Sequence, residues 1–198
     1  VIAPTSLMYN WEQECNRFAP DLSVLVLHGA SRKAHLDNLD NYDLILTTYP
    51  LILRDKAFLL KHTFHLLILD EAQFVKNSKS LSAQIVMQLK ANHRLCLTGT
   101  PMENHLGELW SLFHFLMPGL LGDTKTFSSR YRTPIEKHGD NERKQLLTRR
   151  IAPFLLRRTK NLVAKELPPK IETISYIELE DDQRDLYETI RVAMEDKV

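Results

Sequence analysis

The chain has few cysteines, few glycines and no long hydrophobic run in its 198 residues. Its two cysteines, Cys15 and Cys96, follow neither the spacing of a metal site nor that of a disulfide framework. No apolar run approaches the ~18 residues that a membrane-spanning helix needs. These absences exclude a small disulfide-stabilised protein, a thiolate metal domain and a membrane-spanning segment. The hydrophobic content of 43% is enough for a sizeable core.

Charge is distributed unevenly, although the formal net charge is only +1. Residues 125–170 contain thirteen Lys and Arg against four Asp and Glu, whereas residues 171–198 contain three against nine. Such a basic segment is compatible with a surface that faces a polyanion. A helical segment whose charges pair with the acidic tail would give the same pattern, so both interpretations stay open.

Strand and helix patterns alternate over the first hundred residues. The strand candidates are nearly continuous apolar runs, as is typical of strands covered on both faces. They are residues 1–3, 22–28, 42–48, 64–70 and 93–99. One helical pattern between them places five apolar residues on a common face: Leu7, Met8, Trp11, Cys15 and Phe18. A second does the same with Leu81, Ile85, Val86 and Leu89. This alternation predicts an α/β fold with a parallel sheet.

The pattern changes after Pro101. Residues 106–118, LGELWSLFHFLMP, predict a strongly apolar helix, and turn-forming residues then gather up to about residue 145. Residues 170–179 alternate with period two, which predicts a return strand. A final helix would carry Leu186, Tyr187, Ile190 and Met194 on one side. We therefore expect three parts: a sheet domain over 1–117, a basic helical appendage over 118–169, and a return strand and helix over 170–198.

Two carboxylates end the fourth predicted strand, within the stretch LLILDEAQFVKN (Leu66–Asn77). Asp70 and Glu71 repel each other, and burial disfavours both charges unless a positive group lies beside them. In a parallel sheet, ligands bind beyond the carboxyl ends of the strands. Three other predicted strands end in segments with hydroxyl groups or glycine. Four segments should therefore share one rim of the sheet: residues 4–6, 47–49, 70–73 and 98–101.

A complex of magnesium with a nucleoside triphosphate would supply the missing positive charge. Asp70 would hold Mg²⁺, often through water, and Glu71 would accept a proton from an attacking water. An acidic turn that opens a helix at Ala72 explains the same two residues, because carboxylates favour a helix N-terminus. Likewise, Thr98 and Thr100 either hydrogen-bond near the acids and respond to the phosphate state, or form an ordinary Thr-Gly-Thr-Pro turn.

Five motifs occur in one order along the chain: VIAPTSLMYNWEQE, LTTY, LILDEAQFVKN, LTGTPMENHLGELWSLFHFLMPG and PFLLRRTKNLVAKELPPK. Together they closely resemble the Swi/Snf-type ATPases of helicase superfamily two, particularly the bacterial members. The resemblance implies a three-layer RecA-like fold, a parallel sheet flanked by helices, with a helical appendage specific to the family. It also implies two RecA-like lobes with ATP between them and double-stranded DNA across the top, of which this chain is the first.

The resemblance assigns catalytic roles around the acid pair. Asp70 matches the magnesium-binding acid and Glu71 the water-activating acid of a DEAD/DEAH-like motif. Gln73 stands where the family usually has His, and since Gln does not titrate near neutral pH, any coupling through it must use hydrogen bonds. The nucleotide-side motif that links hydrolysis to movement of the lobes is matched by Thr98, Gly99 and Thr100.

Two further motifs match loops that touch a DNA strand in the family. The first comprises Pro4 and Thr5 with the neighbouring Ser6, and the second comprises Thr47 and Thr48. Hydroxyl and backbone N–H contacts to phosphates position a duplex without reading its sequence. These residues therefore predict binding to double-stranded DNA with little sequence preference.

Two basic motifs are harder to interpret. Arg157 and Arg158, with Lys160, match an LRRxK motif that would contact phosphate or the second lobe, although structural salt bridges explain it equally well. Lys76 and Asn77 match a family signature after the acids, and an exposed helix end is the simpler interpretation of that pair.

No glycine of the chain begins or ends a GxxxxGK[ST] phosphate-binding loop. The family places this loop just upstream of residue 1, and places the second lobe, with its arginine finger, after residue 198. Since the chain opens on VIAP without Met, we expect a segment of a longer protein. With only the acid half of the site, the segment alone is expected to bind ATP weakly and to hydrolyse none.

The sequence favours a segment of a DNA-dependent ATPase that moves along duplex DNA and remodels protein–DNA complexes, with ATP and Mg²⁺ as cofactors. The alternative from another class is a non-catalytic RecA-like module that binds DNA or protein through its basic surface. A third hypothesis, an RNA helicase of the same superfamily, is disfavoured by the PFLLRRTK…LPPK stretch. The resemblance further implies a cytoplasmic, nucleoid-associated bacterial protein, whose partners are duplex DNA, the second lobe and a DNA-bound protein complex.

Overall fold

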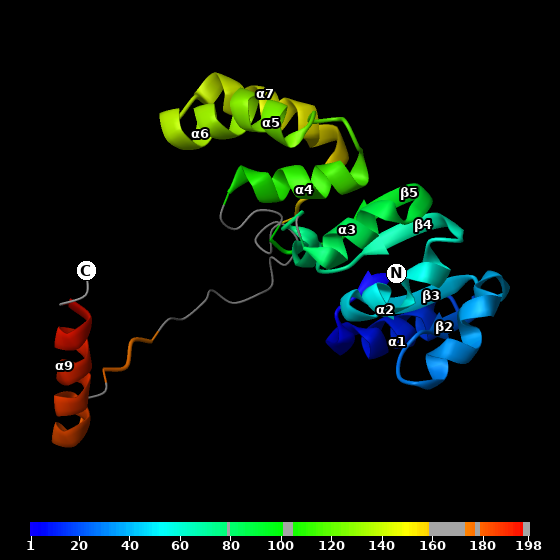
Figure 1. Ribbon diagram of the computed structural model, residues 1–198, viewed down its shortest axis with the longest axis horizontal. Coiled ribbons are helices and arrows are strands. Elements are labelled where there is room, and N and C mark those ends of the chain that lie inside the picture. The colour runs from blue at the N-terminus through cyan, green and yellow to red at the C-terminus, as the bar shows by residue number, and fades with distance from the viewer. Residues whose placement is uncertain (79, 101–104, 159–172, 177–178, 196–198) are drawn as a thin grey trace. The chain divides into compact units, whose positions relative to one another are not determined.

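Five apolar segments form one parallel sheet in the computed structural model, which describes residues 1–78, 80–100, 105–158, 173–176 and 179–195 (Figure 1). The strands are β1 (Ile2–Ala3), β2 (Val24–Val26), β3 (Leu44–Thr48), β4 (Thr63–Leu69) and β5 (Lys90–Cys96). Their order in the sheet is β2-β3-β1-β4-β5, and every neighbouring pair is parallel. The predicted α/β fold with a parallel sheet is therefore confirmed.

Helices cover both faces of this sheet. Because successive strand residues point to opposite faces, Ile2 and Ala3 of β1 belong to different clusters of buried side chains. Ala3 packs with Met8 and Trp11 of helix α1 (Met8–Phe18). Ile2 belongs to the main core, which is covered by three helical segments: the 3₁₀ segment η2 (Ser31–Asn41), α2 (Tyr49–Leu59) and α3 (Leu81–Gln88).

Two apolar residues that the helical patterns place on buried faces lie at the surface instead. Phe18 is 70% exposed and Leu81 is 69% exposed. Phe18 is the last residue of α1, where the guanidinium of Arg17 lies over its ring at 4.9 Å from the centroid. Leu81 is the first residue of α3, directly after the capping residue Ser80. The pattern fails at helix ends because a helix that crosses a sheet touches it only along its middle.

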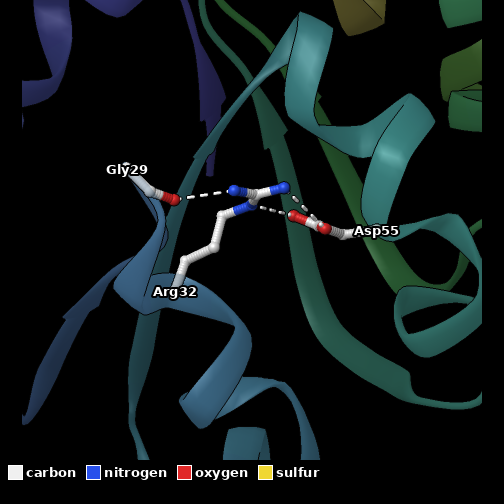
Figure 2. A network of polar contacts seen from close by, with 3 residues as sticks. All are labelled: Gly29, Arg32 and Asp55. Atoms are coloured by element: carbon white, nitrogen blue, oxygen red, sulfur yellow. Dashed lines mark hydrogen bonds and ion pairs between the residues drawn. The ribbon is translucent and has the colours of Figure 1, made fainter.

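A buried ion pair fastens η2 to α2 (Figure 2). Arg32 Nε donates to Asp55 Oδ2 at 2.8 Å and Nη2 donates to Oδ1 at 3.3 Å, while Nη1 donates to the Gly29 carbonyl at 2.6 Å. Both side chains are nearly inaccessible, at 8% and 4% exposed. Two charges removed from water destabilise a fold unless they are paired and hydrogen-bonded, and this fork-shaped contact satisfies both conditions.

A helical layer follows the sheet and spans residues 106–151. It consists of α4 (Leu106–Leu116), α5 (Thr124–Phe127), the π turn η4 (Ser128–Arg132), α6 (Thr133–His138) and α7 (Asn141–Ile151). The predicted apolar helix is α4, which supplies Leu112 and Phe115 to the main core. Its other apolar residues join a second core made within the layer, whose members include Trp110, Phe127 and Tyr131.

Residues 155–198 form a second compact unit, separate from residues 1–154. Its described helix, α9 (Asp181–Glu195), is the predicted final helix. Residues 173–176 lie at the centre of the predicted return strand and are exposed without strand structure, so that prediction is wrong for them. The physical reason is that no described segment of this unit offers a strand edge to pair with. The predicted divisions after residues 117 and 169 stay predictions.

Membrane-spanning helices are absent from the part of the chain that the structure describes. None of its helices has the length and apolar content needed to cross a bilayer.

Candidate functional site

The carboxyl ends of the strands lie level with one another, at one rim of the sheet. Leu69, the last residue of β4, lies opposite Ile2 of β1 on one side and Cys96 of β5 on the other. Beyond it, the Asp70 N–H donates to the Ile2 carbonyl at 2.9 Å. On the other side of β1, Ala3 lies opposite the end of β3. The predicted convergence of the segments after β1, β3, β4 and β5 is confirmed for residues 4–6, 47–49, 70–73 and 98–100, called the rim below.

Asp70 is held in place on three of its oxygen atoms. Its Oδ1 accepts the N–H of Glu71 at 2.9 Å, and its Oδ2 accepts the indole N–H of Trp11 at 2.8 Å. The Tyr49 hydroxyl donates to its backbone carbonyl, also at 2.8 Å. A carboxylate oxygen has two lone pairs, so each oxygen retains one for a further partner. The carboxylate is therefore fixed in orientation and still able to bind a ligand.

Glu71 adopts a left-handed backbone conformation, with φ 49° and ψ 52°. Among the described residues it is the one non-glycine residue with positive φ. This conformation costs about 1–2 kcal/mol for an L-residue with a Cβ. Flanking bonds hold it: Ala72 N–H donates to the Leu97 carbonyl and Phe74 N–H to the Glu71 carbonyl, both at 3.0 Å. Strain kept in this way is characteristic of functional sites.

A chain of hydrogen bonds runs from the segment after β5 to the second acid. The Thr100 N–H donates to Thr98 Oγ1 at 3.1 Å, and the Thr98 hydroxyl donates to Gln73 Oε1 at 2.9 Å. The Gln73 amide then donates to Glu71 Oε2 at 2.7 Å. Every donor in this chain, called the Thr98–Gln73–Glu71 chain below, points toward Glu71. Gly99 lies exposed between the two threonines. Gln73 thus hydrogen-bonds both Thr98 and Glu71, as coupling between these two residues through Gln73 would require. The coupling itself stays a prediction.

The residues expected to touch DNA differ in accessibility. Pro4 is partly exposed, and Thr5 and Ser6 are exposed where the short 3₁₀ turn η1 (Thr5–Leu7) begins. Thr47 and Thr48 are only 4% and 2% exposed, and Thr47 Oγ1 is buried without a hydrogen-bond partner. A duplex would meet the first loop directly, whereas the threonine hydroxyls of the second lie inside the sheet. The DNA contacts of both loops stay predictions.

Two basic motifs occupy different settings. Arg157 and Arg158 are exposed and belong to the second unit, while Lys160 lies outside the described residues. Lys76 follows the 3₁₀ turn η3 (Ala72–Val75), and its Nζ lies 3.5 Å from Glu108 Oε1. Because Glu108 is buried in the first turn of α4, Lys76 links the acid loop to the helical layer. Lys76 does stand at the end of η3, as the simpler interpretation has it, but its partly exposed side chain is paired with a buried acid, whereas Asn77 is exposed.

Sequence reasoning missed the roles of Trp11 and Tyr49. Trp11 was predicted only as an apolar face residue of its helix, and Tyr49 only as a member of the rim. Indole and phenol groups inside a fold need a hydrogen-bond partner, and this requirement is the signal that could have drawn attention to them. The Tyr49 ring stacks on Phe74 at 5.2 Å between centroids. Burial raises the pKa of the Tyr49 hydroxyl, so it remains a protonated donor.

The donor set of the rim fits a magnesium–nucleotide complex better than a metal bound by protein alone. Within the described residues, no group of three or more His, Cys, Asp and Glu side chains could surround a metal ion. Mg²⁺ commonly binds one or two carboxylates, with water and substrate phosphates completing its octahedron. Asp70, fixed and with free lone pairs, would hold such an ion, and Glu71 lies beside it.

Comparison with known proteins places the chain in a family. The model of the SNF2-related domain matches residues 1–198, the whole chain. The chain belongs to the SNF2-related domain family. The chain matches a solved SWI2/SNF2 ATPase core of Sulfolobus solfataricus in complex with double-stranded DNA, with a TM-score of 0.77 and 43% identity over 95% of this chain and 40% of that chain. The predicted RecA-like fold is thereby confirmed.

Curated relatives of this SNF2 domain come from distant organisms. YwqA of Bacillus subtilis, named as an ATP-dependent helicase/translocase, is 44% identical over 195 residues, which are 96% of this chain and 21% of YwqA. The TATA-binding protein-associated factor MOT1 of Saccharomyces cerevisiae is 42% identical over 200 residues, 94% of this chain and 11% of MOT1. The SNF2 domain thus spans only 21% and 11% of the lengths of these two relatives. The expected bacterial type stays a prediction.

Proposed function

We propose that the full-length protein containing this SNF2 domain hydrolyses ATP when it binds duplex DNA and uses the energy to move along the duplex and remodel protein–DNA complexes. The Thr98–Gln73–Glu71 chain beside the fixed carboxylate of Asp70 carries this proposal, because it joins the predicted water-activating acid to the segment predicted to respond to phosphate. The relatives named as ATP-dependent helicases and the solved relative with double-stranded DNA support it.

The residues of the rim divide the chemistry between them. Bound magnesium and ATP would supply the reacting phosphate and neutralise its negative charge. Asp70 orients that complex with the oxygen lone pairs that Trp11 and the Glu71 N–H leave free. Glu71 accepts the proton of the attacking water, and Gln73 fixes its carboxylate through Oε2. Loss of the Thr98 contact would release Gln73, so phosphate-dependent movement at Thr98 would reach the acid.

Hydrolysis also needs parts that this sequence does not contain. A phosphate-binding loop of the GxxxxGK[ST] type is absent from residues 1–198, and phosphoryl transfer depends on positioning and charge neutralisation around the phosphates. The isolated 198-residue chain is therefore expected to hydrolyse no ATP with or without DNA. Hydrolysis by the isolated chain that disappears in Glu71→Gln would contradict this expectation.

Replacement of Glu71 in the full-length protein tests the proposal. General-base catalysis contributes about 10²–10⁴-fold, so Glu71→Gln should lower the DNA-stimulated ATPase rate by that factor. A matched control is Glu142→Gln, which makes the same change at an exposed position of α7. Steady-state phosphate release with and without duplex DNA gives the rates. Equal rates in wild type and Glu71→Gln would contradict the role of Glu71. An absence of DNA-stimulated hydrolysis by the wild-type protein would leave a non-catalytic binding module as the better description.

Two further experiments test which polynucleotide stimulates the protein and whether the protein moves along it. Duplex DNA should stimulate the wild-type protein more than duplex RNA does, since A-form shape and 2′-hydroxyl groups present a different surface. Phosphate-dominated binding should also weaken steeply as salt is raised and should depend little on sequence. Displacement of a third strand from a triplex, without separation of the two duplex strands, would report translocation. Preferential stimulation by RNA would favour the RNA-helicase hypothesis.

A further inference from the structure

Two aromatic side chains from earlier, separate parts of the sequence hold Asp70. Trp11 donates its indole N–H to the side-chain Oδ2 of Asp70, and Tyr49 donates its hydroxyl to the backbone carbonyl of the same residue, both at 2.8 Å. The two donors come from different helices, α1 and α2. The side chain and the main chain of one acid are thus fixed by two separate elements.

Each aromatic residue stands on the helix that directly follows a loop expected to contact DNA. The turn η1 joins Pro4 to α1, and the Leu7 N–H donates to the Pro4 carbonyl at 3.0 Å. Trp11 lies in the first turn of that helix. Tyr49 is the first residue of α2, directly after Thr48 at the end of β3. A displacement of either loop is therefore transmitted to Asp70 through a rigid helix and one hydrogen bond.

The contacts limit how the acid can move. Of the two carboxylate oxygens, Oδ1 is bonded within the acid loop, to the Glu71 N–H, while Oδ2 is bonded to Trp11 of another element. Rotation of the carboxylate would break the indole bond. Tyr49 is rigid, because its ring is 3% exposed and stacked on Phe74. The orientation of Asp70 therefore depends on where α1 and α2 place these two donors.

We propose that Trp11 and Tyr49 are positioning residues that couple the two loops expected to contact DNA to the carboxylate of Asp70, which is proposed to bind magnesium. This inference rests on the proposed function and deepens it, because it names the route by which a bound duplex reaches the acid. A merely structural Trp11 would satisfy its indole N–H without affecting metal binding or the response to DNA. A positioning Trp11 affects both, since carboxylates that bind metals depend on the hydrogen bonds that orient them.

The chain offers a matched control for each residue. Trp110 is a buried tryptophan of the helical layer whose indole N–H donates to the Gly122 carbonyl at 3.0 Å. Tyr131 is a tyrosine of the second core whose buried hydroxyl has no hydrogen-bond partner. The variants Trp11→Phe and Trp110→Phe each remove one indole, and Tyr49→Phe and Tyr131→Phe each remove one hydroxyl. Only the first member of each pair loses a bond to Asp70.

Two measurements on the full-length protein test the inference. The first is the affinity for Mn²⁺ in the presence of a non-hydrolysable ATP analogue, read from the EPR signal of the free ion. Loss of an orienting partner typically weakens metal binding about 10–100-fold, so Trp11→Phe should weaken Mn²⁺ affinity by roughly tenfold or more. The second is the ratio of ATPase rates with and without duplex DNA at saturating Mg²⁺. This ratio should fall in Trp11→Phe and Tyr49→Phe and stay at the wild-type value in Trp110→Phe and Tyr131→Phe.

The outcomes separate this inference from the proposed function. Wild-type Mn²⁺ affinity and a wild-type DNA ratio in Trp11→Phe would overturn the inference while leaving the proposed function intact. A wild-type protein that duplex DNA does not stimulate would overturn the proposed function itself. If Trp11→Phe does not fold, the test uses Tyr49→Phe, which removes a single oxygen atom. A wild-type ratio of ATPase rates with and without duplex DNA in that variant would overturn the inference.

Discussion

The rim of the sheet and the helical layer use their polar side chains differently. At the rim, Gln73 and Thr98 each hydrogen-bond another side chain, and Trp11 of α1 bonds the rim residue Asp70; two of these three bonds lead to a carboxylate. In the helical layer, the indole of Trp110 and the hydroxyls of Ser111 and Ser129 bond backbone carbonyls, while the side-chain bond from Arg132 to Glu136 lies at the exposed surface. Most side-chain hydrogen bonds in proteins go to backbone or water, so the helical layer is the ordinary case and the rim is the exception.

This difference indicates what each region does. Side-chain bonds to the backbone cap helices and fix turns, so their loss destabilises the fold. Bonds between side chains can break and re-form without altering any helix or strand, which suits a site that must change with its ligand. Substitutions in the rim should therefore lower activity and leave the stability of the fold nearly unchanged. Substitutions in the helical layer should lower stability and leave activity nearly unchanged.

The largest expected effect on stability lies in the core of the helical layer. Phe127 is fully buried against Tyr131, and replacing a buried Phe by Ala typically costs about 3–5 kcal/mol of unfolding free energy. Phe127→Ala should show this loss in urea denaturation of the full-length protein. The DNA-stimulated ATPase rate per folded molecule should remain near wild type. If the folded Phe127→Ala protein showed a large fall in that rate, the proposed difference between the rim and the helical layer would be contradicted.

A smaller effect, on activity alone, is expected in the rim. Thr98→Val keeps the shape of the side chain and removes the hydroxyl that donates to Gln73. Losing a bond of about 1.4 kcal/mol from the catalytic arrangement lowers a rate about tenfold, and we expect this loss in the DNA-stimulated ATPase. The midpoint of urea denaturation should stay close to that of wild type. Thr126→Val, at an exposed position of α5, is the matched control, and a shared loss of activity would argue against the Thr98–Gln73–Glu71 chain.

The smallest effect is a pH dependence of the helical layer. Partial burial would raise the pKa of Glu136, but the Leu106 N–H bonded to Oε1 at 2.6 Å and the Arg132 guanidinium outweigh it and lower that pKa. A carboxylate with a lowered pKa stabilises the fold above its ordinary pKa of 4.5, and this contribution is lost as pH falls through the folded value. The stability difference between wild type and Glu136→Gln should therefore shrink below pH 4.5.

Much of the sheet could be predicted from the sequence because each strand and helix has a pattern within its own short segment. Five apolar runs separated by helical patterns are enough to indicate parallel strands, and parallel strands place their carboxyl ends at one rim. Asp70, Glu71 and the Thr98 segment could therefore be brought together before any coordinates were available. The apolar helix expected over residues 106–118 could also be predicted, since α4 is apolar over nearly its whole length.

Other features depend on contacts that no local pattern encodes. The buried pair Arg32–Asp55 joins residues 23 positions apart, and nothing near either residue distinguishes it from a surface charge. The bond from Trp11 to Asp70 joins residues 59 positions apart. The left-handed conformation of Glu71 is imposed by neighbouring segments, because Glu has no preference for it. The predicted return strand had the right periodicity, yet its described residues 173–176 form no strand, because a strand requires an edge to pair with as well as a pattern.

The backbone at Glu71 has a consequence for how this domain can evolve. Glycine adopts the same left-handed conformation without steric cost, so a glycine at this position would relieve the local strain. Selection for heat tolerance alone would thus favour removing the one side chain proposed to activate water. A carboxylate that persists there, against that gain, must be kept by selection for turnover, and stabilising this domain by design should begin far from residue 71.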